Sequence, residues 1–422
     1  MIDVTTITAG SMISSGLFVI PGLAFAQAGP AVILSYLLAA LIALPTMLSA
    51  AELATAMPRA GGIYFFVNKS MGPGMGSVAG FARWLSISLK SSFSLIGLGV
   101  YSAIFTGVNP LLISAVFCLI FVAINLRGVS LVGKTQTLLT LALAGLLLGV
   151  SAWGLTSVTV NRFVPFSPHG PGGILAAAGF IFISYGGMLS ITGLAEEVKR
   201  PKHNIPLGML MALVLTGIVY TLVIFVVIGN LDSDLLQASL TPVADGAAVY
   251  LGSTGAILMT LAALLAFVTT ANAGIASASR YPLAMSRNRL IPALFLNTTA
   301  QKPIPYVSVF FTGGFILAAM LWLKLEMLVE AASSLLMLTY ILTNLAVIIM
   351  RRQNLAAYRP SFRAPLFPWL QLFSIAGLLL LIVKISLYSL LVSFTLVVLS
   401  YAWYFFYTRS LKQSTEEPPR TG

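Results

Sequence analysis

The chain has 422 residues, of which 58% are hydrophobic and only 8% charged, and its mean hydropathy is +0.98. Soluble domains are about 45–50% apolar and roughly 25% charged, so this composition excludes a soluble enzyme and indicates a polytopic membrane protein. The single cysteine excludes an intrachain disulfide and a cysteine-based metal cluster. The net charge of +12 rests on too few charged residues to line a nucleic-acid groove, so no nucleic-acid partner is expected.

Twelve apolar stretches lie near the length of about 20 residues that a transmembrane helix needs. They cover residues 5–27, 31–56, 77–107, 109–126, 135–156, 172–194, 206–229, 254–279, 305–323, 328–350, 366–385 and 388–408. The first stretch is not a cleaved signal peptide, because it lacks a basic start and has glycines and serines at its middle. An even number of spans predicts that both termini lie on the same side of the membrane.

The distribution of basic residues predicts which side this is. Most of the 23 lysines and arginines, Arg83 among them, are assigned to one alternating set of loops. The opposite loops have only Arg162, Lys324 and Lys384, together with a larger number of acidic residues. Because cytoplasmic loops are enriched in lysine and arginine, both termini are expected in the cytoplasm and the protein in the plasma membrane.

Small and flexible residues interrupt two of the stretches near their middle. The first contains residues 10–18 (GSMISSGLF), and the sixth contains residues 182–188 (FISYGGM). Each cluster alone is also explained by close helix packing, but the two occupy corresponding positions in two five-span halves. Interrupted helices of this kind mark the substrate site of many secondary transporters. Their free N–H and C=O groups can bind the carboxylate and the ammonium of an amino acid.

Short motifs along residues 8–370 resemble those of the amino acid–polyamine–organocation permeases. They are residues 10–18 (GSMISSGLF), 52–54 (ELA), 58–64 (PRAGGIY), 125–129 (NLRGV), 196–201 (EEVKRP), 204–206 (NIP), 279–280 (SR), 285–287 (MSR), 290–292 (LIP) and 359–365 (RPSFRAP). Any one of them is short, but their order and spacing together are specific.

The resemblance implies an all-α polytopic membrane protein with the leucine-transporter fold. This fold has a 5+5 inverted repeat of transmembrane helices and, in addition, two peripheral helices. The expected division is a first repeat at 1–156, a second repeat at 157–352 and two peripheral spans at 353–409. The polar residues 410–422 are expected to form a disordered cytoplasmic tail.

The resemblance also implies a substrate site at the two interruptions. Ser14, Ser15 and Gly16 are expected to bind the substrate carboxylate through backbone N–H groups, and Ser184 to bind the α-ammonium through neighbouring carbonyls. The other residues expected at the site are Met12, Ser94, Ile183, Tyr185, Gly186 and Gly187. Tyr185 has a second interpretation as an ordinary packing aromatic.

The chain departs from the family at its ion-coupling positions. Many members have an acid shortly after the sixth-span glycine, where this chain has Met188 and Leu189, and some have a fifth-span lysine that this chain lacks. Lys90, however, lies inside the third span, where a charge costs about 2.5–3.5 kcal/mol. We expect it to face the central cavity, either as a proton carrier or as a fixed cation that replaces sodium. The alternative is that it snorkels or hydrogen-bonds serines to hold the bundle together.

Two further groups of residues have both a functional and a structural interpretation. Thr269 and Thr270 are weak candidates for a sodium site, but interhelical hydrogen bonds by these residues and Asn272 are favoured. Glu196 and Glu197 are candidates for pairing with Arg280 or Arg287 as a cytoplasmic gate, although surface ion pairs are each worth little.

These observations predict a secondary active transporter that works by alternating access. Because no aspartate or glutamate falls within a span core, small or apolar neutral amino acids are expected rather than cationic substrates. Proton-coupled symport or exchange is expected, in a monomer or a homodimer without a cofactor. The alternative is a non-transporting sensor or partner-dependent subunit of the same fold. An intramembrane enzyme is a distant third, because His169 and His203 both fall in loops.

Overall fold

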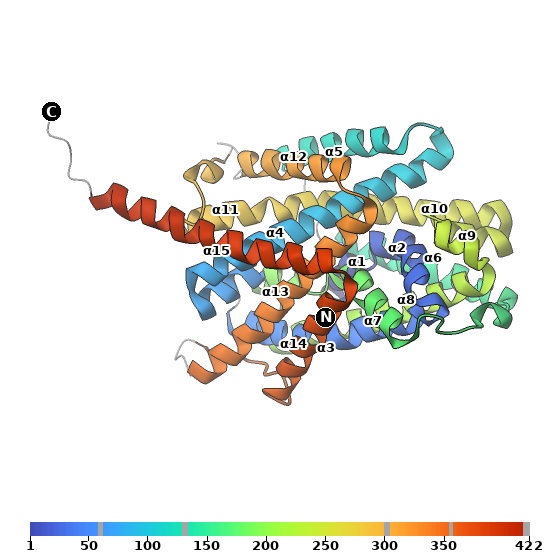
Figure 1. Ribbon diagram of the computed structural model, residues 1–422, viewed down its shortest axis with the longest axis horizontal. Coiled ribbons are helices and arrows are strands. Elements are labelled where there is room, and N and C mark those ends of the chain that lie inside the picture. The colour runs from blue at the N-terminus through green and yellow to red at the C-terminus, as the bar shows by residue number, and fades with distance from the viewer. Residues whose placement is uncertain (58–61, 129–133, 299–303, 354–357, 417–422) are drawn as a thin grey trace.

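The computed structural model describes residues 1–57, 62–128, 134–298, 304–353 and 358–416, and these residues form helices and loops without a β-strand (Figure 1). The α-helices are α1 (Ile2–Met12), α2 (Ser15–Ala28), α3 (Val32–Ala56), α4 (Gly62–Thr106), α5 (Pro110–Leu126), α6 (Lys134–Gly154), α7 (Gly170–Phe180), α8 (Pro201–Asn230), α9 (Ser233–Ala238), α10 (Pro242–Ala278), α11 (Arg280–Arg287), α12 (Tyr306–Trp322), α13 (Leu325–Gln353), α14 (Trp369–Ile385) and α15 (Leu387–Glu416). The 3₁₀-helices are η1 (Gly29–Ala31), η2 (Leu155–Ser157), η3 (Val160–Phe163), η4 (Ile181–Tyr185), η5 (Ser190–Glu197) and η6 (Ala293–Leu296). Residues 58–61 and Val129, which belong to two of the motifs above, lie outside this description.

Eight helical segments of the described residues are long and apolar enough to cross a membrane, and three shorter apolar helices accompany them. One of the eight, Ser15–Ala56, contains both α2 and α3, which separate where Gly29 adopts a positive φ of 62°. A polytopic membrane protein is therefore indicated. The number of twelve spans remains a prediction.

Two of the longest helices contain a glycine at which the backbone leaves helical geometry. In α4 this is Gly72, with φ 83°, and Pro73 follows it. In α10 it is Gly252, with φ 59°. Only glycine adopts such angles readily, and proline is well suited to the first turn of the helix that follows. The expected spans 77–107 and 254–279 both begin shortly after these kinks.

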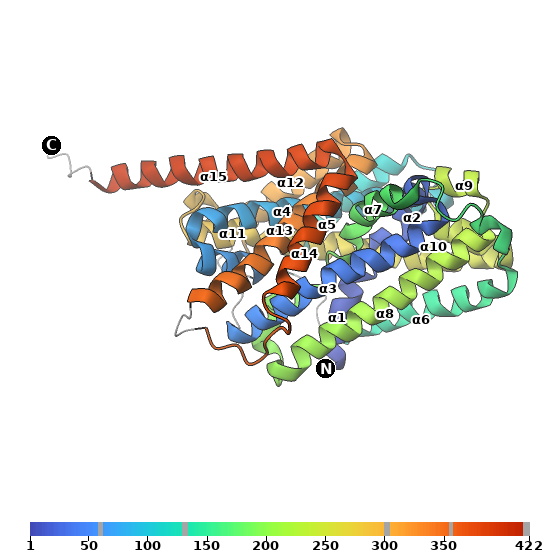
Figure 2. The ribbon, with the colours of Figure 1, turned by 60° about the horizontal axis from the view of Figure 1, so that its bottom comes forward.

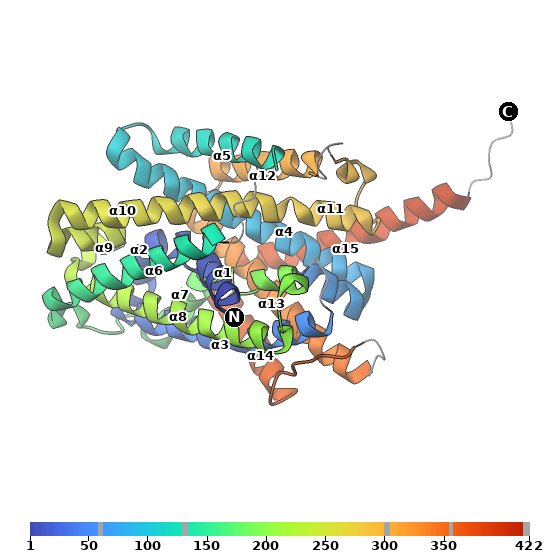
Figure 3. The ribbon, with the colours of Figure 1, turned by 180° about the vertical axis from the view of Figure 1, so that it is seen from behind.

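Helices α1 and α2 lie inside the bundle, surrounded by longer helices (Figures 1 and 3). Helix α1 packs against α8 and α6, and α2 packs against α10 and α7. Helix α4 passes along α10 and α13, and α5 and α12 lie side by side at the outer edge (Figure 3). Fully buried aromatic side chains such as Phe18, Tyr185 and Phe267 fill the interior, and leucines such as Leu112 and Leu119 of α5 are exposed on the outside. An apolar outer surface of this kind suits a lipid environment.

The C-terminal helix α15 extends beyond the other helices (Figure 2). It continues to Glu416, so the disordered tail that we expected at 410–422 is wrong for its first residues. Leu411, Lys412 and Gln413 are good helix formers, which explains how the helix continues past the apolar segment. Residues 417–422 lie outside the described residues.

Candidate substrate site

The first interruption lies between α1, which ends at Met12, and α2, which begins at Ser15. Ser14 is extended at the N-cap of α2 but caps no N–H group with its side chain. Its Oγ is buried and has no hydrogen-bond partner among the described residues. The first turn of α2 thus keeps free N–H groups and the partial positive charge of a helix N-terminus, which favour a carboxylate.

The second interruption begins where α7 ends at Phe180. The tighter η4 (Ile181–Tyr185) follows, and a turn through Gly186 and Gly187 leads to η5. Ser184 is fully buried in this segment, and within the described part of the chain its Oγ has no hydrogen-bond partner. Both interruptions therefore fall where the glycine and serine clusters predicted them.

Two glycines bring the interruptions into direct contact. A Cβ at Gly16 would lie 2.3 Å from Ser184 Oγ, and a Cβ at Gly187 would lie 2.2 Å from the carbonyl oxygen of Ser11. No larger side chain fits either position without displacing its neighbour. From α4, Ser94 Oγ lies 2.7 Å from Ser15 Oγ and so adds the third span to the same site.

Hydroxyl groups from α8 and α13 satisfy the carbonyl groups of the interrupted segments. The Tyr220 hydroxyl donates to the Met12 carbonyl and lies 3.4 Å from the Ser184 carbonyl, and it thereby joins the two segments. Tyr340 donates to the Tyr185 carbonyl at 3.2 Å. Because backbone groups at membrane depth need internal partners, these bonds explain how the helices remain interrupted there.

Ser333 of α13 satisfies two more backbone groups. It donates to the Phe180 carbonyl at 2.9 Å and accepts the Ile183 N–H at 3.1 Å. The carbonyl side of the site is thus held by the protein's own donors, whereas the N–H side at the start of α2 is uncapped. The sequence alone did not identify Tyr220, Tyr340 or Ser333. The only signal was a polar side chain within each apolar stretch.

Arg83 corrects our assignment of this residue to a cytoplasmic loop. It lies within α4, is only 7% exposed, and its Nη2 donates to the Gly186 carbonyl at 3.2 Å. The assignment was wrong because α4 is helical on both sides of Arg83, and its side chain faces the second interruption. Its Nε is buried without a partner among the described residues.

Tyr185 acts as a packing residue in this structure. It is fully buried, and its hydroxyl donates to the Tyr36 carbonyl at 2.9 Å. Its ring meets the Tyr220 ring edge-on, with 5.6 Å between centroids. These contacts agree with the second interpretation of Tyr185, and its role in the substrate site remains a prediction.

Lys90 occupies the helical turn before Ser94 on α4, and its carbonyl lies 2.9 Å from Ser94 Oγ. Residues 83, 90 and 94 share one face of the helix, because separations of seven and four residues correspond to about two turns and one turn. The side chain is half-buried, and it forms no ion pair within the described ranges. Lys90 is thus brought close to the substrate site, and its role in coupling remains a prediction.

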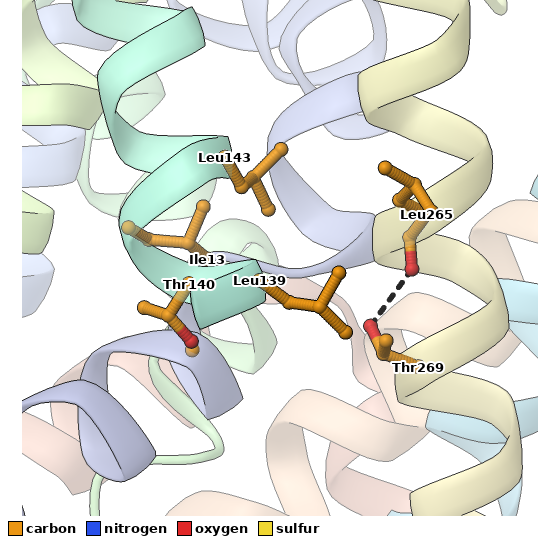
Figure 4. Close-up of a pocket in the computed structure, with 7 residues that line it drawn as sticks. Ile13, Leu139, Thr140, Leu143, Leu265 and Thr269 are labelled. Atoms are coloured by element: carbon orange, nitrogen blue, oxygen red, sulfur yellow. Dashed lines mark hydrogen bonds between the residues drawn. The ribbon is translucent and has the colours of Figure 1, made fainter. Parts of the chain in front are cut away.

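A small cavity of about 20 Å³ lies between α1, α6 and α10 (Figure 4). Its lining consists of Gly10, Ile13, Leu139, Thr140, Leu143, Leu265 and Thr269. Thr269 turns its hydroxyl toward its own helix, 2.9 Å from the Leu265 carbonyl and 3.0 Å from that of Ala266. The mainly aliphatic lining offers few of the oxygen ligands that a hard cation needs.

Interhelical hydrogen bonds were expected from Thr269, Thr270 and Asn272, and the structure gives side-chain hydrogen bonds for two of these residues. Asn272 accepts from Asn125 Nδ2 of α5 at 2.9 Å, as expected. Thr269 bonds within its own helix, so the expectation of an interhelical bond was wrong there. Thr270 is half-buried on α10. The described residues contain no cluster of three or more histidine, cysteine, aspartate or glutamate side chains suited to a metal.

The four residues of the expected cytoplasmic gate are all exposed. Glu196 and Glu197 lie at the end of η5, and Arg280 and Arg287 begin and end α11. Of the residues that the structure describes, only Glu52 and Arg351 form an ion pair. The gate is thus not formed in this conformation and remains a prediction for another.

Comparison with known proteins identifies the family. Residues 3–413 match the sequence model of the amino acid permeases. The chain belongs to the amino acid permease family. The resemblance that the motifs indicated is therefore confirmed, and the protein is a multi-pass membrane transporter of an amino acid permease family rather than an enzyme.

Three relatives illustrate the range of this permease family. The methylthioribose transporter of Bacillus subtilis (strain 168) is 26% identical over an alignment of 404 positions, which covers 90% of this chain and 86% of that protein. The branched-chain amino acid permease BcaP of the same organism is 25% identical over an alignment of 435 positions, which covers 96% of this chain and 92% of that protein. The vacuolar cationic amino acid transporter 4 of Arabidopsis thaliana is 26% identical over 388 residues, covering 83% and 62%.

Proposed function

We propose that this permease is a secondary active transporter of small or apolar neutral amino acids. It works by alternating access across the plasma membrane, with both termini in the cytoplasm. Its helices follow the leucine-transporter fold, with two inverted repeats of five spans, two peripheral spans and substrate bound at the two interruptions. The two interruptions, one in each proposed repeat, support this arrangement.

The observation that carries the proposal is the uncapped N-terminus of α2 beside Ser184. Free N–H groups and the unpartnered hydroxyls of Ser14 and Ser184 are suited to a carboxylate. The carbonyls of Met12 and Ser184 both lie within hydrogen-bond reach of the Tyr220 hydroxyl. Since a carbonyl oxygen has two lone pairs, each can also accept from an ammonium.

The charges near the site support neutral rather than cationic substrates. Arg83 and Lys90 are both on the face of α4 near the site, and no carboxylate pairs with either in the described structure. A cationic substrate side chain would be repelled by these groups and would find no acidic partner. The two positive charges therefore favour the substrate class named for the branched-chain permease over that named for the cationic transporters.

Lys90 is proposed to couple transport to an ion. It acts either as the proton carrier of symport or as a fixed positive charge in place of sodium, and exchange of amino acids is the other mode. The aliphatic lining of the small cavity beside Thr269 is consistent with transport that needs no sodium. The pairs of Glu196 or Glu197 with Arg280 or Arg287 are proposed to form when the cytoplasmic side closes further.

Reconstitution of the purified protein into liposomes tests this function. Counterflow of radiolabelled leucine, alanine and arginine is measured with and without sodium, at pH values from 5 to 8. We expect leucine or alanine to exchange independently of sodium, and arginine not to compete. Arginine uptake would contradict the substrate class. Binding of neutral amino acids without counterflow would favour the sensor.

A further inference from the structure

We infer that Arg83 is a positioning residue that holds the second interruption against α4 and keeps the cytoplasmic side of the substrate site closed. The inference rests on the alternating-access function proposed above. Arg83 acts through the Gly186 carbonyl, which accepts its Nη2 at 3.2 Å. This bond joins two segments that are about a hundred positions apart in the sequence.

The place of Arg83 along α4 gives it this role. Ser94, which contacts Ser15 of the site, follows Arg83 by eleven residues, and this separation is about three helical turns. Arg83 lies on the side of Ser94 toward the start of α4, at the proposed cytoplasmic loop. Gly186 likewise lies between Ser184 and η5, whose end at Glu197 is exposed. The bond therefore lies between the substrate site and the cytoplasm.

The guanidinium depends on this backbone contact for its stabilisation. It is nine-tenths buried, and no carboxylate pairs with it in the described structure. The Gly186 carbonyl directly follows η4, where α7 and its 3₁₀ extension end and the helix dipole is negative. A buried cation at such an end is favourable only while the segment stays in place, so the charge and the segment position each other.

The bond also restricts how the permease can move. Arg83 belongs to α4, whereas Gly186 belongs to the interrupted segment, which also contacts α1, α2, α3 and α13. Opening of the site toward the cytoplasm separates these two groups and has to break the bond. Loss of the guanidinium should consequently expose the chain just beyond Gly186 without exposing the opposite end of α4.

A thiol-accessibility experiment measures this exposure. In a Cys118→Ser background, which has no other thiol, Ser190→Cys places a reporter four residues beyond Gly186. Ser190 Oγ is buried without a partner in the described structure, so the reporter is expected to be shielded. In lipid nanodiscs, Arg83→Met should raise the maleimide labelling rate of the reporter at least fivefold. Arg83→Lys, which keeps a charged donor, should stay within twofold of the parent.

A second reporter separates opening from general loosening. Ser102→Cys lies near the other end of α4, and Arg83→Met should leave its labelling rate unchanged. An unchanged rate at position 190, a similar increase at both positions, or equal rates in Arg83→Lys and Arg83→Met would overturn the inference. The labelling needs no substrate. If the parent protein transports no amino acid, the proposed function is contradicted. The labelling rates would still test the role of Arg83.

Discussion

The Glu52 carboxylate is fully buried against the Arg351 guanidinium, with 2.7 Å between Glu52 Oε1 and Arg351 Nε. The pair joins the end of α3 to the end of α13. Tyr358 donates to the same carboxylate at 2.7 Å, and the Ala364 N–H donates at 2.8 Å. The acid of the ELA motif thus holds the chain that leads from α13 to α14. This chain contains the motif at residues 359–365, which lies some 300 residues beyond the ELA motif in the sequence.

Removal of one charge from this pair should destabilise the protein strongly. Breaking a buried ion pair leaves the partner uncompensated and costs about 3–5 kcal/mol. We expect Glu52→Gln and Arg351→Gln each to lower the melting temperature, measured by fluorescence in detergent. Glu196→Gln, an exposed acid on η5, is the control and should cost less than about 0.5 kcal/mol. Additive losses in the Glu52→Gln, Arg351→Gln double variant would contradict the pairing, because coupled residues lose less together.

Tyr358 should make stability depend on alkaline pH. Burial, and then the negative charge of Glu52, raise the pKa of the Tyr358 hydroxyl above its ordinary value of about 10. A group with a raised pKa in the folded state contributes stability below the unfolded pKa and loses it as pH rises further. The melting temperature should therefore stay constant from pH 7 to 9 and fall above about pH 10. Tyr358→Phe should lower it at pH 7 and flatten the alkaline fall. An equally steep fall in the variant would assign the effect to other tyrosines.

The sequence predicted the interruptions but not the groups that hold them. Gly16 and Gly187 indicate that the two interrupted segments approach each other closely, because only glycine fits at these positions. Tyr220 and Tyr340 lie in apolar stretches whose rotation about the helix axis the sequence does not determine. Arg83 was placed in a loop because a count of basic residues cannot distinguish an arginine near a helix end from one inside the helix.

Gly16→Ala should abolish transport while leaving the protein folded. The added Cβ would lie 2.3 Å from Ser184 Oγ and separate the two interruptions, and overpacking of this kind costs about 1–3 kcal/mol. We expect uptake in liposomes to fall more than tenfold. Gly314→Ala in α12 is the matched control, because no atom lies within 4 Å of its added Cβ, and uptake should be retained. Equal uptake by both variants would show that the contact is not part of the substrate path.

Lys90 tests the proposed coupling. If its charge carries or replaces the coupling ion, Lys90→Ala and Lys90→Arg should abolish uptake or remove its dependence on pH. Lys384→Ala, which changes an exposed lysine at the end of α14, should transport normally. Initial rates of uptake from pH 5 to 8 provide the measurement. Normal pH-dependent uptake by both Lys90 variants would leave only the structural role, in which the side chain snorkels or stabilises the bundle.

Tyr220→Phe should lower the melting temperature of the substrate-free protein more than that of the substrate-bound protein. Without the hydroxyl, the buried carbonyls of Met12 and Ser184 lose their donor, which costs about 1–3 kcal/mol. An α-ammonium that binds the same carbonyls would restore a donor, so added substrate should raise the melting temperature more in the variant than in the parent. Tyr36→Phe is the control, because the Tyr36 hydroxyl has no hydrogen-bond partner within the described structure, and it should leave the shift of the melting temperature by substrate the same as in the parent. An equal shift by substrate in Tyr220→Phe and the parent would mean that the ammonium binds elsewhere.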